Sequence, residues 1–388
     1  MNIGYDAKRA FQNKTGLGNY SRSLIKILSS NYPQHQYTLF APKQTSLFQI
    51  NQPCIKVISP LSGFGKKFPS WWRRRGVVKD ISKERIDIYH GLSNELPVGL
   101  DKINVKKIVT VHDLIFERYP ETYNFDERYV HRWKIKAACK TADTIIAISQ
   151  QTKNDLIEVY KIPENKIAIC YQSCNTVFQR KVNDDEKKEI KKRYKLPDQY
   201  FLFVSSIAPR KNLLTVCKAM KLLKDQFNIP LVVIGDGKKE KDEVKRFMND
   251  NQMQDQLILL NELPASKEDS FISAADFPAI YQQATALIYP SLFEGFGLPV
   301  LEALWSGLPV ICSDTSSLPE AGGDAALYFS PLNVEELAKQ MLRVVQDEAL
   351  ATSMREKGFN HAKNFSPENY AVNMIRIYEQ TINAAKIH

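Results

Sequence analysis

Apolar runs of four to six residues recur along the whole chain, separated by amphipathic segments long enough to form helices. Buried parallel strands have this short, continuously apolar character, and the connection between two of them needs a helix-length segment. The pattern therefore predicts parallel sheets with helices on both faces, an α/β fold. The expected strands are 3–6, 37–40, 55–59, 86–90, 107–112, 144–149 and 167–171 in the first half, and 200–205, 230–235, 257–260, 286–289 and 309–312 in the second.

The length of the chain favours two such domains. At 388 residues, each half can bury a core of its own. A polar, lysine-rich stretch separates the two sets of expected strands, which makes it the natural boundary. We therefore expect domains at 1–178 and 199–366, joined by a linker at 179–198 and followed by a C-terminal helix at 367–388.

Composition is typical of a soluble globular protein, with 44% hydrophobic and 25% charged residues. No apolar run reaches 18 residues, so no membrane-spanning helix is expected. The N-terminal residues lack the apolar segment of a signal peptide. The six cysteines follow neither a disulfide framework nor a zinc pattern. Together these features predict free thiols and a cytoplasmic protein.

Positive charge is concentrated in the first half of the chain. Residues 1–178 carry a balance of +12 and residues 179–388 a balance of −2, within a total of +10. This asymmetry suggests an anionic partner for the first half, such as membrane phospholipid, a lipid pyrophosphate or nucleic acid. The segment Lys66–Arg75 combines five cations with two tryptophans and no acid, which suits an anionic membrane surface. A packed helix with solvated charges is an equal alternative.

The most specific local pattern follows the expected strand 286–289. A loop with Gly295 and Gly297 comes next, and Pro299 then falls in the first turn of an expected helix, 299–306. A helix N-terminus favours a phosphate, and glycine lets the backbone approach a ligand closely. The pattern therefore indicates a phosphate-binding loop between a strand and a helix.

Two carboxylates flank this loop. Glu294 precedes the glycines and Glu302 lies about one turn into the helix, so each can accept hydrogen bonds from hydroxyls on its own side of the phosphate. A ligand with hydroxyls at both ends and phosphate between them is a nucleotide sugar. Under the alternative interpretation, Glu294 only favours the helix N-terminus and Glu302 lies on a solvated face.

The Glu-x7-Glu spacing resembles the donor-site motif of the retaining family-4 glycosyltransferases (glycosyl transferases group 1), which have the GT-B fold. The resemblance implies that Glu294 contacts sugar hydroxyls and Glu302 the ribose. It also implies that the backbone after Glu294 approaches the sugar and diphosphate, through Gly295, Phe296, Gly297 and Leu298. For the whole chain it implies two doubly wound Rossmann-like domains facing a cleft, the first binding the acceptor and the second the nucleotide sugar. The C-terminal helix is expected to return to the N-terminal domain.

Two elements in the first half fall in the order of the same family. Gly16 and Gly18 lie in a glycine-rich loop that opens an expected helix, 18–28, and resembles the family loop near the donor diphosphate and the acceptor. A Gly-x-Gly pair alone is often only a tight turn. His112 ends an expected strand, where doubly wound sheets place ligand contacts. It resembles the family histidine that hydrogen-bonds the donor sugar, although capping by Asp113 beside a passive histidine is an alternative.

His90, at another strand end, and the nearby Glu95 are further candidates, on the acceptor side.

Two adjacent cations, Arg210 and Lys211, precede an expected helix in the second half. Arginine offers a planar fork and lysine a point charge, which together suit a diphosphate. The pair resembles the family's diphosphate clamp, but Ser205 and Ser206 replace the commoner Val-Gly-Arg form and the cations are adjacent. The resemblance therefore supports Lys211 more firmly than Arg210. A solvated basic turn is the alternative.

Several motifs are absent from the sequence. There is no Asp-x-Asp to hold a metal on a diphosphate, so no metal site and no cofactor are expected. There is also no Walker loop and no Gly-x-Gly-x-x-Gly, which argues against an NTPase or a dehydrogenase. Charge on the leaving group would then be neutralised by Arg210, Lys211 and helix dipoles.

The resemblance implies a retaining, metal-independent hexosyltransferase of polysaccharide biosynthesis, acting by front-face transfer. Its donor would be a GDP- or UDP-linked sugar, with mannose or glucose favoured, and its acceptor a glycan or a lipid-linked sugar. We expect it in the cytoplasm, on the inner face of the cytoplasmic membrane. The alternatives are a sugar-nucleotide 2-epimerase of the same architecture and a non-enzymatic nucleic-acid-binding protein. The latter would bind with a steep salt dependence, but no nucleic-acid readout module is apparent, so no nucleic-acid partner is expected.

Overall fold

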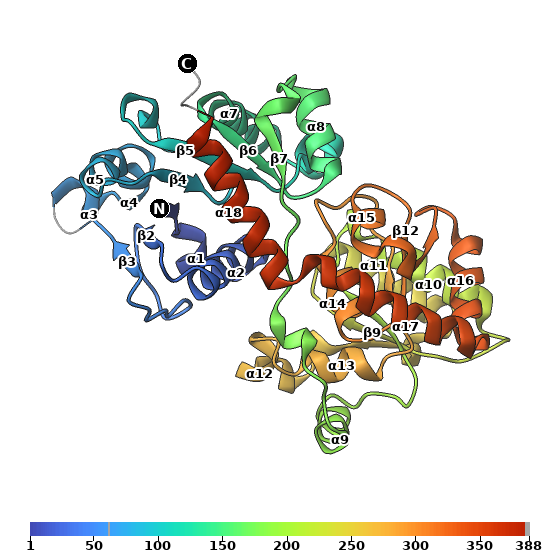
Figure 1. The fold of residues 1–388 in the computed structure, drawn as a ribbon. Coiled ribbons are helices and arrows are strands. Elements are labelled where there is room, and N and C mark those ends of the chain that lie inside the picture. Colours follow the sequence, from blue (N-terminus) through green and yellow to red (C-terminus); the bar gives the residue numbers. More distant parts are fainter. Residues whose placement is uncertain (61–62, 385–388) are drawn as a thin grey trace. The chain divides into compact units, whose positions relative to one another are not determined.

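The computed structural model describes residues 1–60 and 63–384, which form two compact units (Figure 1). The first unit comprises Met1–Ser173 and Pro367–His388, and the second comprises Cys174–Ser366. The chain therefore leaves the first unit slightly before the expected boundary at 178. The expected linker 179–198 is part of the second unit. The last four residues of the expected C-terminal helix, 385–388, lie outside the described residues.

The first unit is built on a parallel sheet that, within the described residues, has seven strands in the order β3-β2-β1-β4-β5-β6-β7. Its strands are β1 (Asn2–Asp6), β2 (Gln36–Phe40), β3 (Ile55–Ile58), β4 (Ile88–Gly91), β5 (Lys106–Val111), β6 (Thr144–Ala147) and β7 (Ile167–Ile169). Its helices are α1 (Lys8–Gln12), α2 (Gly16–Asn31), α3 (Gly63–Lys67), α4 (Pro69–Trp71), α5 (Val77–Lys83), α6 (Ile115–Arg118), α7 (Phe125–Thr141), α8 (Gln150–Tyr160) and α18 (Pro367–Asn383).

The second unit is built on a parallel sheet of six strands, in the order β10-β9-β8-β11-β12-β13. Its strands are β8 (Phe201–Val204), β9 (Leu231–Ile234), β10 (Leu257–Leu259), β11 (Ala286–Tyr289), β12 (Val310–Ser313) and β13 (Ala326–Phe329). Its helices are α9 (Asp184–Arg193), α10 (Leu213–Leu223), α11 (Lys239–Asp250), α12 (Asp269–Ile272), α13 (Phe277–Gln283), α14 (Leu298–Trp305), α15 (Leu318–Gly322), α16 (Val334–Gln346) and α17 (Glu348–Ala362).

These two sheets confirm the predicted fold class of two doubly wound, Rossmann-like domains. All twelve expected strands are present, and β13 is an additional edge strand that the sequence pattern did not indicate. In each sheet the strand order reverses once, between β1 and β4 in the first unit and between β8 and β11 in the second. Ligands of such sheets bind beyond the carboxyl ends of the strands on either side of this reversal.

The C-terminal helix α18 packs into the core of the first unit, which confirms its predicted return (Figure 1). Its buried residues join the same apolar cluster as β1, β2 and α2. Tyr378 is fully buried, and its hydroxyl shares hydrogen bonds with Tyr5 Oη at 3.2 Å and His90 Nδ1 at 2.8 Å. A helix that follows the second unit in the sequence therefore completes the core of the first unit.

The six cysteines are buried free thiols, as their spacing predicted. Within the described part of the chain, no helix is both long and apolar enough to cross a membrane.

Candidate active site

Three charged side chains meet at the strand reversal of the second unit. Arg210 and Lys211 lie in a 3-10 turn, Pro209–Lys211, that follows β8, and Glu294 lies in the loop that follows β11. β8 and β11 are hydrogen-bonded neighbours in the sheet. The structure thus brings together the three residues that the sequence had proposed, at the place where a doubly wound sheet binds ligands.

The Glu294 carboxylate is held by several donors at once. Its Oε1 accepts hydrogen bonds from Lys211 Nζ at 2.5 Å and from Tyr289 Oη at 3.1 Å. Arg210 Nη1 lies 3.2 Å from the same oxygen and also donates to the Phe293 carbonyl. All these contacts are inside the second unit, and both Lys211 and Glu294 are more than nine-tenths buried.

The charge balance of this cluster is positive, with two cations against one carboxylate. Burial by itself would raise the pKa of Glu294, but the Lys211 ammonium and the Arg210 guanidinium outweigh it and lower that pKa below its usual value. Glu294 is therefore ionised at neutral pH and is a weak proton acceptor. A positive cluster with an ionised carboxylate suits anion binding and hydroxyl orientation better than general-base catalysis.

Backbone contacts fix the two loops relative to each other. Leu292 N–H donates to the Arg210 carbonyl at 2.8 Å, and Asn212 Nδ2 donates to the Pro290 carbonyl at 3.1 Å. Asn212 is in the left-handed conformation, with a φ of 58°, and stands immediately before α10. The tight turn at Asn212 places Arg210 and Lys211 immediately before the first turn of α10. The Asn212 side chain, through its hydrogen bond, holds this turn against the loop after β11.

The glycine-rich loop is shaped as the sequence predicted, with α14 at Leu298–Trp305 against an expected 299–306. Gly297 has a φ of 122°, and a Cβ there would lie 2.9 Å from Leu318 Cδ2, so glycine is required. Phe296 is buried against the Phe365 ring, so only its backbone could contact a ligand. Ser317 Oγ lies 2.9 Å from the Glu294 carbonyl oxygen and 2.8 Å from the Phe296 carbonyl oxygen. Its single hydroxyl proton is shared between these two acceptors, which ties the loop to Ser317.

Glu302 lies on α14 and has a different environment from Glu294. Its Oε2 accepts a hydrogen bond from Tyr281 Oη, on α13, at 2.9 Å. Burial raises the pKa of Glu302 to about 7, and the Tyr281 hydrogen bond opposes this only in part. No cation offsets the burial, so the two carboxylates of the motif have pKa values displaced in opposite directions.

In the first unit, His112 follows β5 and is almost completely buried. Its Nε2 donates to the Leu92 carbonyl at 2.9 Å, and its ring packs edge-on against Tyr20. Burial lowers the pKa of His112 to about 4. The ring is therefore neutral at pH 7, with its proton on Nε2, so Nδ1 is the nitrogen that can accept a hydrogen bond from a hydroxyl.

The two glycines of the first-unit loop both lie in the first turn of α2, which begins at Gly16 and not at the expected 18. A Cβ at Gly18 would lie 1.9 Å from the Asn13 carbonyl oxygen, so this position has no room for a side chain. A Cβ at Gly16 would meet nothing within 4 Å. Gly18 is therefore needed for the fold of the turn, whereas Gly16 leaves open space at the helix start.

The structure contradicts the acceptor-side hypothesis for His90, whereas that for Glu95, a partly exposed residue in a cluster of ion pairs, stays a prediction. His90 is fully buried, and its two ring nitrogens are 2.8 Å from Tyr378 Oη and 2.8 Å from Thr110 Oγ1. Glu95 accepts from Arg73 Nη1 at 2.7 Å and Lys134 Nζ at 2.8 Å. Both side chains are engaged in packing the first unit.

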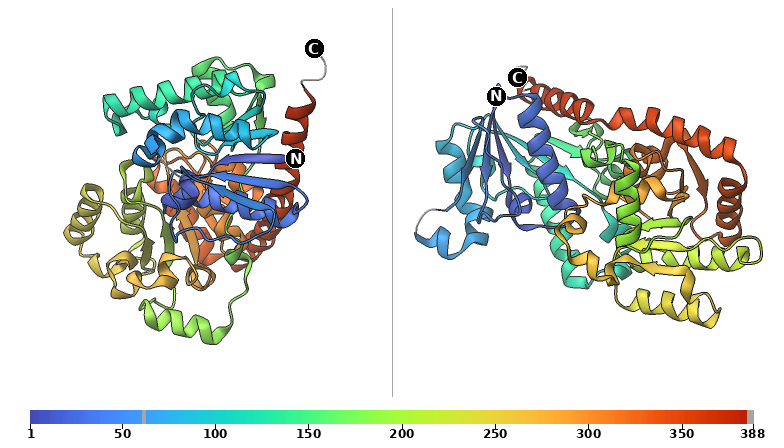
Figure 2. Two further views of the ribbon diagram at one scale, coloured as in Figure 1. Left: turned by 90° about the vertical axis from the view of Figure 1, so that its left-hand side faces the viewer. Right: turned by 90° about the horizontal axis from the view of Figure 1, so that it is seen from below.

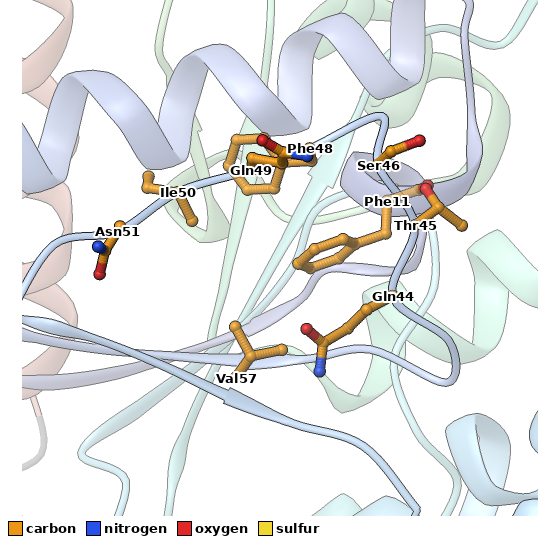
Figure 3. A pocket seen from close by; sticks show the side chains of 9 residues that line it. All are labelled: Phe11, Gln44, Thr45, Ser46, Phe48, Gln49, Ile50, Asn51 and Val57. Atoms are coloured by element: carbon orange, nitrogen blue, oxygen red, sulfur yellow. The ribbon is translucent and has the colours of Figure 1, made fainter.

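The first unit has an open pocket of about 630 Å³ between the loop after β2 and strand β3 (Figure 3). Its polar lining consists of amides and hydroxyls, and no charged residue lines it. The Phe11 ring lies in the middle of the view, between Gln44 and Phe48, and Ile50 and Val57 are the other apolar residues of the lining. None of the predicted site residues lines this pocket.

Sequence reasoning missed the tyrosines of the site. Tyr289 ends β11 and its hydroxyl contacts both Glu294 and Lys211, yet in the sequence it is only the last residue of an apolar run. Tyr281 lies 21 residues from its partner Glu302, and no local signal joins them. One signal for Tyr289 was available in the sequence. It is a tyrosine, with a polar hydroxyl, at the carboxyl end of the expected strand that precedes the motif.

Among the residues that the structure describes, no three His, Cys, Asp or Glu side chains are grouped so that they could hold a metal ion. Whether the reaction needs a metal stays a prediction.

The fold and the charged loops define a two-domain protein of the doubly wound α/β class. Known sequences refine this class. Residues 15–177 match the model of the family Glycosyltransferase Family 4, and residues 184–361 match the model of the family Glycosyl transferases group 1. The chain therefore belongs to the family-4 type of glycosyltransferases with the GT-B fold, and it is a glycosyltransferase.

Individual proteins agree with this assignment. The chain is 28% identical over 390 residues to O-antigen chain mannosyltransferase B of Escherichia coli, covering 96% of each protein. Two solved structures share its fold. A glycosyltransferase of Rickettsia africae has a TM-score of 0.73 at 17% identity and 98% coverage of both chains. A sucrose-phosphate synthase of Thermosynechococcus elongatus has a TM-score of 0.74 at 19% identity, with 99% and 100% coverage.

Proposed function

We propose that this glycosyltransferase is a retaining, metal-independent enzyme that moves a hexose from a GDP- or UDP-linked sugar to a glycan or a lipid-linked sugar. The cluster of Arg210, Lys211 and Glu294 at the strand reversal carries the proposal. Mannose is the favoured hexose because a relative that is similar over almost the whole chain is named an O-antigen chain mannosyltransferase.

In this proposal the two cations bind the donor diphosphate. A diphosphate ester brings two negative charges, and the cluster has one positive charge in excess before the donor arrives. As the bond to the sugar breaks, charge grows on the leaving phosphate, and the guanidinium and ammonium stabilise it in a site with little water. Glu294 then orients the sugar hydroxyls, Glu302 the ribose, and neutral His112 accepts a hydrogen bond from the sugar.

The acceptor is proposed to bind in the first unit. The uncharged pocket beside β3 supports this, because amides and hydroxyls beside apolar side chains suit a neutral sugar (Figure 3). Its neutrality stands out in a half of the chain that carries a balance of +12. Association with the cytoplasmic face of an anionic membrane is part of the proposal, since a lipid-linked acceptor would lie there.

The experiment that tests the proposal is a transfer assay with a panel of nucleotide sugars, chosen first by thermal shift. A ligand that binds only the folded state raises the melting temperature. The expected result is one stabilising GDP- or UDP-hexose, release of its nucleoside diphosphate, and a glycosylated acceptor whose anomeric configuration matches the donor. An inverted product would refute the retaining mechanism, and an epimerised nucleotide sugar formed without transfer would identify a 2-epimerase.

Activity should survive an excess of EDTA. The physical reason is that the Arg210 guanidinium and the Lys211 ammonium can stabilise the charge that develops on the leaving phosphate, which is the part a bridging metal would otherwise play. The measurement is the initial rate of transfer in metal-free buffer, with and without chelator. Complete loss in EDTA and recovery with manganese or magnesium would contradict the assignment of Arg210 and Lys211.

Donor affinity should fall as the pH drops below about 7, because burial raises the pKa of Glu302 to about 7. Ribose hydroxyls donate to the ionised carboxylate, so each unit of pH below that value should weaken binding by up to about tenfold until the pKa of the complex is reached. A nucleotide sugar suits this titration, since its doubly esterified diphosphate does not titrate near neutrality. Glu302→Gln should remove the pH dependence, and an unchanged pH profile in that variant would refute the role of Glu302.

The same shift acts on stability with the opposite sign. The folded pKa of Glu302 lies above the ordinary value of 4.5, so the folded protein holds the proton more tightly than the unfolded chain. The contribution of this group is fully present below pH 4.5 and is lost as the pH rises towards about 7. Donor binding above pH 7 therefore uses a carboxylate whose ionisation costs folding free energy.

A further inference from the structure

We infer that the first unit carries an anionic-membrane docking surface made by two segments far apart in sequence, Phe64–Arg75 and the outer face of α7. This deepens the proposed function, because it names the residues that would hold the enzyme beside a lipid-linked acceptor. It does not depend on the transfer chemistry, since membrane binding is measured without donor.

Exposed large apolar side chains gather in these two segments. Within the described residues, seven of the thirteen exposed large hydrophobic side chains belong to them. On α7, Phe125 is 79% exposed and Tyr129 64% exposed. The seven are Phe64, Phe68, Trp71, Phe125, Tyr129, Val130 and Trp133. Solvent-exposed apolar groups concentrated on a surface mark an interaction site, and aromatic rings with a polar edge favour the headgroup level of a bilayer.

The outer half of α7 adds no buried residue to the core that the structure describes. No residue from Phe125 to Lys134 is buried, and the helix enters the core only at Ile135. Phe125, Tyr129 and Trp133 recur at four-residue intervals, so they form one stripe along the helix. A helix face that contacts only water normally carries polar and charged side chains, so three aromatic side chains in one stripe indicate a binding surface.

The two segments are joined by direct contacts. The Arg74 guanidinium lies over the Trp133 ring, 4.8 Å from its centre. In the first segment, the Phe64 ring is 4.5 Å from that of Phe68 and 5.0 Å from that of Trp71. In the left view of Figure 2, α7 and the short helices of this segment are drawn one above the other. The contact between Arg74 and Trp133 is what joins the two segments.

The charges on this surface select an anionic partner. Lys66, Lys67, Arg74 and Arg75 are exposed, and none of them forms an ion pair within the described part of the chain. Lys136 and Lys140 continue the α7 stripe and are also exposed. Two acids, Asp126 and Glu127, stand in the first turn of α7, where the Glu127 carboxylate accepts a hydrogen bond from the Asn124 N–H at 3.3 Å. Aromatic rings beside unpaired cations suit anionic phospholipid, each cation near the surface adding attraction.

The structure also corrects the membrane segment that the sequence suggested. Trp72 is only 4% exposed, and its indole N–H donates to Asp80 at 2.7 Å. Arg73 binds Asp6 through Nη2 at 2.5 Å and Glu95 through Nη1 at 2.7 Å. A π-helical turn, Trp72–Gly76, directs these two inward between exposed neighbours. Neither residue is available to lipid, so the docking surface excludes both.

Sedimentation with phosphatidylcholine vesicles, with and without about 30% phosphatidylglycerol, tests the inference. The wild-type protein should bind only the anionic vesicles, and raising the salt towards 1 M should release it as the Debye length falls to about 3 Å. A variant without the four exposed cations should have a partition coefficient onto anionic vesicles that is lower by at least about tenfold. It carries Lys66→Ser, Lys67→Ser, Arg74→Ser and Arg75→Ser. An aromatic variant with Trp71→Ser, Tyr129→Ser and Trp133→Ser should also bind the anionic vesicles more weakly. In both variants the nucleotide sugar should raise the melting temperature as much as it does in the wild type.

Matched controls lie in the second unit. Replacing the exposed Lys192, Lys221, Lys224 and Lys238 by serine removes the same charge, and Leu222→Ser with Ile272→Ser removes exposed apolar groups elsewhere. These variants should bind anionic vesicles like the wild type. The inference is overturned by a wild-type protein that ignores anionic vesicles at low salt, or by controls that lose binding equally. It is also overturned if the aromatic variant changes only self-association or only affinity for a soluble glycan.

Discussion

Replacing Glu294 with alanine should lower the turnover number by at least about 100-fold, because two hydrogen bonds from sugar hydroxyls to a charged group contribute roughly 1.5–3 kcal/mol each. The substitution also leaves Lys211 buried without the carboxylate that it now contacts at 2.5 Å. Breaking a buried ion pair from one side costs about 3–5 kcal/mol of folding free energy, so the melting temperature should fall as well. Steady-state rates with the donor found by thermal shift, together with an unfolding curve, measure both effects.

Two further variants separate catalysis from stability. Glu294→Gln keeps the shape and one acceptor oxygen but loses the charge, so it should recover part of the stability and little of the turnover. Glu335→Ala removes an exposed carboxylate from α16 in the same unit and should change neither quantity. If Glu294→Ala turned over at nearly the wild-type rate once its concentration was corrected for folded protein, the proposed role of Glu294 in the reaction would be wrong.

Replacing Lys211 with methionine should lower turnover by roughly 100–1000-fold, the range found when one group that stabilises a developing anion is removed. Methionine keeps most of the apolar stem and removes the charge that faces the diphosphate. The loss should appear mainly in kcat, because charge on the leaving phosphate is greatest in the transition state. Rates measured over a series of donor concentrations separate this from a loss of binding.

The Lys211 variant also makes a prediction about pH. The Lys211 ammonium is the strongest influence that keeps the pKa of Glu294 low against its burial. Without it that pKa should rise, and the remaining activity should decline at a higher pH than in the wild type as the pH is lowered. Lys221→Met, on the exposed side of the following helix α10, is the matched control and should behave like the wild type. A Lys211 variant with wild-type kcat would remove the diphosphate clamp from the mechanism.

Much of the fold was predictable because each strand is marked by its own apolar run. The sequence pattern did not indicate β13, because it is a short edge strand, Ala326–Phe329, whose middle residues are only partly buried. The boundary between the two domains was predicted a few residues too late, because the charge of the lysine-rich stretch does not show which unit its helix packs against. The lysine-rich stretch is a polar helix, α9, that packs on the second unit through Ile190 and Tyr194.

The charged residues of the site were predictable because motif spacing is local, but their pairing was not. Lys211 and Glu294 lie 83 residues apart, and only the adjacency of β8 and β11 in the sheet brings them into contact. For the same reason His90 looked like a ligand contact, although the helix that satisfies it, α18, comes 288 residues later. Strand-end position indicates where a side chain starts, whereas tertiary packing decides whether it is free to bind.

The return of α18 has a consequence for how this chain is made. On the ribosome, the first unit is synthesised long before the helix that supplies Tyr370, Met374 and Tyr378 to its core. Until the whole second unit has emerged, an apolar face of the first sheet stays open to water and to other nascent chains. The first unit therefore completes its core only after the second unit has been synthesised. A chain truncated before Pro367 should be less soluble, because the apolar surface that α18 covers would stay exposed.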